Sequence, residues 1–294
     1  MSHLNPNAAK PKRGVSLYSY SGEYGVTMTI EDMFADMYDM GAEGLEILAN
    51  SHIEGYPEPT DAWVENWHRL IEKYHLKPIE YGHWVDSRQY QRRELTTQES
   101  YEKLLRDIKL ANRLGFTIMR TKLGVIDDDL NPVTNWREFI AMALPDAEKY
   151  NVRMCPEIHS PTVLKSKMVD DYVEFIEKHK TKHFGINIDF GVFQTNPLPM
   201  WEGQDVSTMK FSPVEDIVPL LPYTYVCHAK FANMNDDFIE TTTPYDKIIG
   251  LMIEHGWNGY LLSEYEGKNK DVPGYSSGQL RRQHILMKHL LGEG

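Results

Sequence analysis

The chain alternates, over almost its whole length, between short apolar runs typical of β-strands and longer amphipathic segments typical of helices. Eight strand–helix units follow one another, with strands expected over residues 14–20, 44–48, 78–81, 116–120, 152–157, 184–189, 223–228 and 259–264. Regular alternation of this kind predicts a parallel sheet covered by helices. Eight units in 294 residues predict a single (β/α)8 TIM barrel.

Helix signals fall between these strands. Thr29 is the expected N-cap of the first helix, with Asp32 at capping-box spacing and Gly41 at the end. Further helices are expected after Thr60 and over residues 100–114, 136–150, 162–179, 244–255 and 279–291, with a weaker helical segment at 213–221. The alternative, an open doubly wound sheet, fits less well because no Gly-x-Gly-x-x-Gly turn follows the first strand. We therefore expect one catalytic barrel domain over 14–294, preceded by a flexible polar arm over 1–13.

Composition and charge narrow the class of protein. The formal net charge of −12 argues against a nucleic-acid partner, whose phosphates require Lys and Arg. No apolar run approaches the length of a membrane span, and the first residues lack the apolar core of a secretion signal. The two cysteines, Cys155 and Cys227, each lie within an apolar strand and are expected to be buried free thiols. These features predict a cytoplasmic protein with a small-molecule substrate and no membrane contact.

Four successive strands end in a residue that can bind a metal ion. Glu157, Asp189, His228 and Glu264 are separated by 32, 39 and 36 residues, about one strand–helix unit each. In a barrel this spacing brings all four to one mouth. Each residue alone is as well explained by a helix cap, a salt bridge or a buried hydrogen bond, but four consecutive strands with such ends are not. Three carboxylates and one imidazole favour Mn²⁺ or Mg²⁺, with Co²⁺ also possible.

Two neighbouring residues leave alternatives open. Glu266 lies two residues after Glu264 and can share its face of the strand, so either glutamate can be the ligand; Glu264 is preferred because it directly follows the apolar run. His159 lies two residues after Glu157 and points the same way in an extended chain. It can be a ligand, a general base or a hydrogen-bond partner, and the general base is preferred because an unperturbed imidazole titrates near neutrality.

Substrate contacts are expected from residues just beyond the strands. Lys122 and Lys230 can hold a substrate oxygen, although a salt bridge to a local acid explains both equally well. Aromatic and imidazole side chains near the strand ends can line a pocket at the mouth: Tyr18, Tyr20, His52, Tyr81, His83, Trp84 and Phe193.

The strand-end motifs resemble the xylose-isomerase-like superfamily of barrels, the sugar phosphate isomerase/epimerases, from residue 14 onward. They are Cys155-Pro156-Glu157, Ile188-Asp189-Phe190-Gly191, Val226-Cys227-His228-Ala229-Lys230 and Leu262-Ser263-Glu264-Tyr265-Glu266-Gly267. The resemblance implies that Glu157, Asp189, His228 and Glu264 bind one divalent metal. It also implies that the two glutamates move protons next to a sugar carbonyl.

Within this superfamily, residues 12–20 and the segment Pro156-Glu157-Ile158-His159-Ser160 resemble the catalytic subunits of bacterial C-glycoside deglycosidases. That resemblance implies cleavage of the carbon–carbon bond between a 3-oxo-glucosyl unit and a flavonoid-type aromatic aglycone. It also implies a small β-sandwich partner subunit, and hence an oligomer. Enolate formation beside the sugar carbonyl, followed by elimination, is the expected chemistry, with Glu157, Glu264 or His159 as the base and His159 on the aglycone side.

Two other functions remain as alternatives. A metal-dependent sugar or ketose isomerase or epimerase would share the site, but ketose 3-epimerases of the superfamily carry a His and an Arg where this chain has Val192 and Met234. A catalytically inactive binding subunit would not need the complete set of Glu, Asp, His and Glu. The related apurinic endonucleases use more histidine ligands and a basic face, which this acidic chain does not clearly offer.

Overall fold

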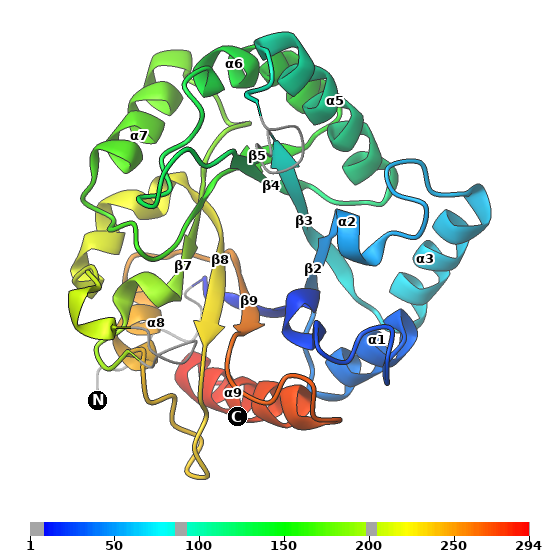
Figure 1. The fold of residues 1–294 in the computed structure, drawn as a ribbon. Coiled ribbons are helices and arrows are strands. Elements are labelled where there is room, and N and C mark those ends of the chain that lie inside the picture. Colours follow the sequence, from blue (N-terminus) through cyan, green and yellow to red (C-terminus); the bar gives the residue numbers. More distant parts are fainter. Residues whose placement is uncertain (1–8, 86–92, 198–204, 294) are drawn as a thin grey trace.

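The apolar runs form parallel strands that close into a barrel surrounded by helices, as predicted (Figure 1). The computed structural model describes residues 9–85, 93–197 and 205–293. The strands are β1 (Lys12–Ser16), β2 (Gly44–Leu48), β3 (Lys77–Val85), β4 (Ile118–Leu123), β5 (Arg153–Cys155), β6 (Glu157–Ile158), β7 (Ile186–Asp189), β8 (Thr224–Phe231) and β9 (Tyr260–Tyr265). They pair in the order β5-β4-β3-β2-β1-β9-β8-β7-β6.

The fifth strand position is interrupted at Pro156, whose ring removes the backbone N–H that a strand would donate. Before the proline, β5 pairs with β4; after it, β6 pairs with β7. A parallel bridge between Met154 and Phe184 joins the two halves of the sheet. In the described ranges, nine short strands therefore occupy the eight strand positions of a TIM barrel.

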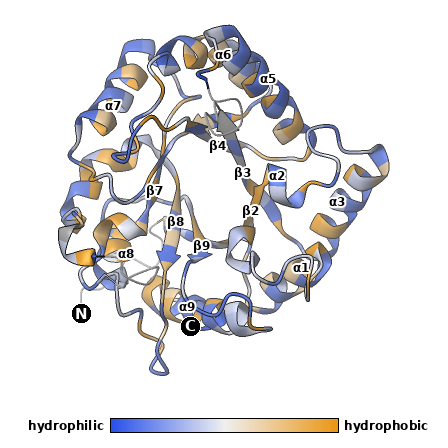
Figure 2. Ribbon diagram, in the orientation of Figure 1, coloured by the Kyte–Doolittle hydropathy of each residue, from blue (hydrophilic) through white to orange (hydrophobic). Residues whose placement is uncertain are grey.

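The outer layer consists of α1 (Ile30–Asp39), α2 (Ala49–His52), α3 (Asp61–Lys73), α5 (Thr97–Arg113), α6 (Trp136–Lys149), α7 (Lys167–His179), α8 (Tyr245–Glu254) and α9 (Tyr275–Leu291). Short 3-10 segments occupy Leu17–Tyr20, Phe190–Phe193, Val206–Thr208 and Val214–Tyr223. Hydrophobic and hydrophilic residues alternate along the helices, as expected for elements with one buried face (Figure 2). Thr29 and Asp32 form the predicted capping box of α1.

Several boundaries differ from expectation. The first strand includes Lys12 and Arg13, so the barrel begins within the expected arm. The strand ends at Ser16, whose hydroxyl accepts a hydrogen bond from the Tyr18 backbone N–H at the start of a 3-10 turn. Helix α7 begins only at Lys167, where the Ser166 side chain caps it. Helix α5 begins three residues early, at a capping box of Thr96 and Glu99.

The barrel interior changes from apolar to charged along the strands. Near the amino ends, five residues from five strands form a small apolar cluster: Ile79, Ile118, Cys155, Val226 and Leu262. Two residues further along β4, β8 and β9 lie Arg120, His228 and Glu264. The apolar cluster thus forms a floor, and the charged side chains lie toward the carboxyl ends, where barrel enzymes keep their chemistry.

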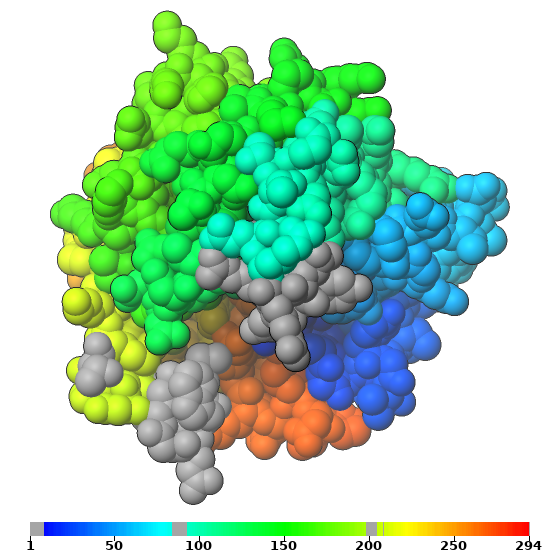
Figure 3. All heavy atoms as spheres, turned by 45° about the horizontal axis from the view of Figure 1, so that its top comes forward, coloured from blue at the N-terminus to red at the C-terminus, as the bar shows by residue number. Residues whose placement is uncertain are grey.

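The first and last parts of the described chain lie side by side. Strand β1 pairs with β9, Arg13 Nε donates to Glu293 Oε2 at 2.8 Å, and the N-terminal and C-terminal parts form adjacent surfaces in Figure 3. Cys155 and Cys227 are free and buried, as predicted. Within the described ranges, no helix is both long and apolar enough to cross a bilayer.

Candidate metal centre

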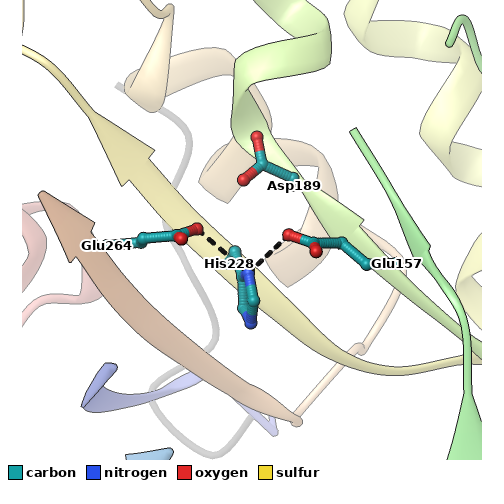
Figure 4. A group of neighbouring side chains, drawn as sticks. All are labelled: Glu157, Asp189, His228 and Glu264. Atoms are coloured by element: carbon teal, nitrogen blue, oxygen red, sulfur yellow. Dashed lines mark hydrogen bonds and ion pairs between the residues drawn. The ribbon is translucent and has the colours of Figure 1, made fainter. Parts of the chain in front are cut away.

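The structure brings the four predicted metal-binding residues together. Glu157 at the start of β6, Asp189 at the end of β7, His228 in β8 and Glu264 in β9 each offer one atom to a group whose members all lie within 4.8 Å of one another. The two glutamates lie on either side of His228, and Asp189 faces the space between them (Figure 4). This arrangement could hold a metal ion.

The two nitrogens of His228 face different surroundings. Nδ1 lies 2.8 Å from Glu157 Oε1 and 3.0 Å from Glu264 Oε2, toward the mouth of the barrel. Nε2 lies 2.9 Å from Glu80 Oε2, in the fully buried interior. Nδ1 is therefore the nitrogen that Glu157, Glu264 and Asp189 surround.

A second acidic group lies on the other side of the same ring. Glu46, Glu80 and His228 also have atoms close enough to hold a metal ion. Both of these glutamates already have polar partners, however. Arg120 Nε donates to Glu46 Oε1 at 2.9 Å, and Asn187 Nδ2 donates to Glu80 Oε1 at 3.1 Å.

The group around Nδ1 has two buried oxygens without a hydrogen-bond donor, whereas the Nε2 side has one, Glu46 Oε2. A single N–H on Nδ1 can donate to only one carboxylate, and Glu157 accepts it, so Glu264 Oε2 is buried without a hydrogen-bond donor. Asp189 Oδ1 accepts from the Gly191 backbone at 2.6 Å, but Asp189 Oδ2 is buried with no donor. Buried oxygens without donors are costly unless a cation binds them. The Nδ1 side therefore fits a divalent ion better than the Nε2 side does.

Gly191 is required by this geometry. Its backbone N–H approaches the Asp189 carboxylate so closely that a Cβ at this position would lie 2.6 Å from Oδ1. The sequence Asp-Phe-Gly at the end of β7 thus fixes one carboxylate oxygen and directs the other toward His228.

Burial and the neighbouring charges shift the pKa values of the carboxylates in this centre. Burial, with the neighbouring Glu264 and Glu157, raises the pKa of Asp189 well above its ordinary value, against the effect of Lys230. Burial would likewise raise the pKa of Glu157, but Arg120 and His228 hold it below the ordinary range. A divalent cation would relieve the repulsion among the three carboxylates.

His159 and Lys122 lie beside Glu157. All three line a small hollow near the mouth, together with residues that follow β4 and β6. His159 Nδ1 lies 2.8 Å from the Ser160 carbonyl oxygen, which can only accept, so Nδ1 carries the proton and Nε2 is left as an acceptor. Burial lowers the pKa of His159, which favours the neutral ring and hence a base.

Glu266 and Glu264 occupy different environments. Glu264 lies beside His228, whereas Glu266 forms an ion pair with Lys230 and accepts a hydrogen bond from the Tyr18 hydroxyl at 3.2 Å. Lys230 thus has the local salt bridge that was one of its two expected roles. Lys270 lies 3.9 Å from the centre of the Tyr18 ring, and burial lowers the pKa of this lysine to about 8.

Some of the expected pocket residues face elsewhere. His52 is buried, with Nδ1 at 3.1 Å from the Leu48 carbonyl oxygen and its ring against Tyr24. Tyr81 and His83 contact Asp107 of α5, outside the barrel, because alternate residues of a strand face opposite sides and Glu80 and Gly82 face inward. The expectation that Tyr81 and His83 line the mouth was therefore wrong.

Four buried polar residues of the interior were not predicted: Glu46, Glu80, Arg120 and Asn187. Each lies within an apolar strand sequence, such as Gly44-Leu45-Glu46-Ile47-Leu48. A polar or charged residue in the middle of a short apolar strand is the signal that could have identified them, because it has to face either the barrel interior or a buried partner.

The fold is a parallel barrel, and its candidate site is a cluster of acidic residues and one histidine toward the carboxyl ends of the strands. The chain belongs to the xylose isomerase-like TIM barrel family, whose model matches residues 34–284.

Two deglycosidase subunits are similar to this chain over nearly its whole length. A 3'-dehydrocarminate deglycosidase alpha subunit of Microbacterium is 24% identical over 97% of this chain and 97% of its own length. A C-glycoside deglycosidase alpha subunit of Arthrobacter globiformis is 23% identical over 95% of this chain and 92% of its own. The crystal structure of a D-psicose 3-epimerase from Clostridium cellulolyticum shares the fold, with a TM-score of 0.68, 13% identity and coverage of 95% and 99%.

Proposed function

We propose that the chain is the catalytic subunit of a metal-dependent C-glycoside deglycosidase, a carbon–carbon lyase. Its substrate would be a 3-oxo-glucosyl unit bonded through carbon to an aromatic, flavonoid-type aglycone. The observation that carries the proposal is the group of Glu157, Asp189, His228 and Glu264 with His159 beside it. The deglycosidase names of relatives that match nearly the whole chain support the choice of reaction.

Glu157, Asp189, Glu264 and Nδ1 of His228 would hold the metal ion in this proposal. Three oxygens and one imidazole nitrogen favour Mn²⁺, with Mg²⁺ or Co²⁺ as alternatives. When bound, the ion would act as a Lewis acid toward the carbonyl oxygen of the sugar. Arg120 Nη1 donates to Glu157 Oε2 at 2.7 Å, so it would hold Glu157 with its other oxygen toward His228.

Proton movement would fall to residues of the chain. The hydrogen at C2 of a 3-oxo sugar is acidic because the carbonyl is adjacent. A base, Glu157, Glu264 or the Nε2 of His159, would remove this proton, and the electron pair would form the C1–C2 double bond as the C1–aryl bond breaks. The aryl carbon would gain a proton, for which His159 is our candidate donor once it has accepted one. The products are the free aglycone and an unsaturated 3-oxo sugar, and no net proton is consumed.

Substrate positioning is assigned to the rim of the site. Lys122, which lines the hollow with His159, would hold a sugar oxygen. Lys230, which is paired with Glu266, would also hold a sugar oxygen. The Tyr18 hydroxyl, which donates to the same Glu266, would contact the substrate beside it. His52 remains a weaker candidate because its ring is buried against Tyr24.

A partner subunit belongs to the proposal. The relatives carry the name alpha subunit, which implies a second chain in those enzymes. We propose a small β-sandwich subunit for this protein as well.

A sugar isomerase or epimerase is the second candidate. The observation in its favour is that Glu157 and Glu264 lie on two sides of His228, where two carboxylates can exchange protons with two faces of one sugar carbon. Against it, the positions at which ketose 3-epimerases carry His and Arg are Val192 and Met234, and both are buried apolar side chains here.

The test is to incubate the purified protein, with Mn²⁺ and any co-encoded small subunit, with a 3-oxo-C-glucoside and to measure free aglycone by chromatography. We expect release that stops with EDTA and in the variants Glu157→Gln and His228→Ala. Folding of both variants is checked by circular dichroism. No release, but exchange of the C2 proton of a ketose with solvent, would replace the lyase by the isomerase.

A further inference from the structure

We propose that Glu80 is a positioning residue: it accepts the Nε2 proton of His228 and thereby leaves the lone pair of Nδ1 for the metal ion. The inference rests on the metal site of the proposed function. It concerns a residue on β3, a strand that contributes none of the four expected ligands.

The contact between the side chains of Glu80 and His228 is short and shielded from solvent. Glu80 Oε2 lies 2.9 Å from His228 Nε2, and both side chains are 0% exposed. A carboxylate faces each ring nitrogen, Glu80 at Nε2 and Glu157 at Nδ1, so each nitrogen can donate a proton when no metal ion is bound. A metal ion at Nδ1, the nitrogen that faces Glu157 and Glu264, would displace the proton there, and the hydrogen bond to Glu80 would keep the remaining proton on Nε2.

Asn187 fixes the direction of this hydrogen bond. Its Oδ1 accepts from the His228 backbone N–H at 3.2 Å, so its Nδ2 is the atom that faces Glu80 and donates to Oε1 at 3.1 Å. Asn187 can therefore only donate to Glu80, and Cys155 Sγ lies 3.6 Å from the same oxygen, Oε1. The surroundings of Glu80 thus suit a hydrogen-bond acceptor. The donors Asn187 and His228 converge on one carboxylate.

A carboxylate that accepts from the second nitrogen of a metal-binding histidine is a recurrent arrangement in metal sites. It fixes the tautomer and the ring orientation, and its loss weakens metal binding by about 10–100-fold. In this chain the arrangement spans the barrel, so a buried residue on β3 would set the ring orientation of a ligand on β8.

Two substitutions at the same position separate positioning from packing. Glu80→Gln keeps the shape: its Oε1 can still accept from Asn187, which puts its amide N–H₂ against His228 Nε2. That nitrogen then has to accept, and the proton moves to Nδ1, where it competes with the metal. Glu80→Ala removes the side chain and leaves the ring free to adopt either tautomer. Positioning therefore predicts that Gln is worse than Ala, whereas packing predicts the opposite.

The experiment is a Mn²⁺ titration of the metal-stripped full-length protein, with free Mn²⁺ measured by electron paramagnetic resonance. We expect the affinity to fall in the order wild type, Glu80→Ala, Glu80→Gln, with a loss of about 10–100-fold for Gln. Glu65→Gln, an exposed glutamate on α3, is the matched control and should bind like the wild type. Circular dichroism and thermal melting establish that each variant is folded.

Other outcomes have distinct meanings. An Ala variant that binds as weakly as Gln, or more weakly, would overturn the positioning role. Loss of binding in both Glu80 variants, with binding kept in Asp189→Asn, would make Glu80 a ligand. No Mn²⁺ binding by the wild type would contradict the metal site itself, and with it the proposed function. If Glu80→Gln does not fold, the ¹⁵N shifts of His228 in the Mg²⁺-loaded wild type decide, and a proton on Nδ1 would overturn the inference.

Discussion

The guanidinium of Arg120 connects two glutamates of the barrel interior: Nη1 donates to Glu157 Oε2 at 2.7 Å and Nε donates to Glu46 Oε1 at 2.9 Å. Arg120 lies on β4, Glu46 on β2 and Glu157 on β6, so a single side chain bridges strands from three positions around the barrel. All three side chains are at most 11% exposed. The arginine thus offsets two buried negative charges, each of which also lies close to His228.

Removal of this arginine should cost the fold much of its stability. Arg120→Met leaves Glu46 and Glu157 without the guanidinium that joins them, and breaking a buried ion pair in this way costs about 3–5 kcal/mol. The measurement is urea unfolding in EDTA at neutral pH. Adding Glu46→Gln to the Met variant should recover part of the loss, since one buried charge is then removed. A loss below about 1 kcal/mol would show that the interaction is not compensating buried charge.

Mn²⁺ should stabilise the folded chain through Asp189. At a free concentration of 100 times the Kd, a ligand that binds only the folded state adds about 2.7 kcal/mol to the free energy of unfolding. Asp189→Asn should lose most of this gain yet be no less stable than the wild type in EDTA, because Asp189 Oδ2 has no hydrogen-bond donor there. Unfolding with and without Mn²⁺ measures both effects. An equal gain in the variant would exclude Asp189 as a ligand.

His159 should matter for turnover and not for metal binding. His159→Ala should lower kcat by about 10²–10⁴-fold, the usual contribution of a general base or acid, and should leave Mn²⁺ affinity within a few-fold of the wild type. His255→Ala, an exposed histidine at the end of α8, is the control and should be fully active. A variant at position 159 that no longer binds Mn²⁺ would make His159 a ligand.

Acid should weaken the fold through Asp107. Burial alone would raise the pKa of this carboxyl, but His83, Tyr81 and Arg106 hold it below its ordinary value. A depressed pKa contributes stability that is present above the unfolded value of about 3.9 and is lost as pH falls through the folded value. Asp107→Asn should therefore be less stable than the wild type at pH 7, and the difference should shrink below pH 4. Urea unfolding of both proteins at pH 7 and below pH 4 measures the difference in the free energy of unfolding, and an equal difference at the two pH values would contradict this account.

The order of the elements could be predicted because each one carries a local signal. Strand β2 was predicted with its observed bounds, and the Thr29 cap placed α1 correctly. The meeting of Glu157, Asp189, His228 and Glu264 could also be predicted, because the carboxyl ends of barrel strands share one mouth.

The interior partners could not be predicted in the same way. Whether Glu80 or Tyr81 faces inward depends on the register of β3 against β2, and that register shifts by one residue at Leu45 and Glu46. A shift of one residue exchanges the two faces of a strand. The pairing of Glu80 with His228 joins β3 to β8, strands far apart in the sequence that only the closed barrel brings together.

The most direct test of the metal centre is a crystal structure of the Mn²⁺-soaked protein with anomalous data collected near the manganese edge. The account predicts a single strong peak at bonding distance from Glu157, Asp189, Glu264 and His228 Nδ1, with Nε2 of the same ring still hydrogen-bonded to Glu80. A peak on the Nε2 side, between Glu46 and Glu80, would contradict it, and so would the absence of any manganese peak.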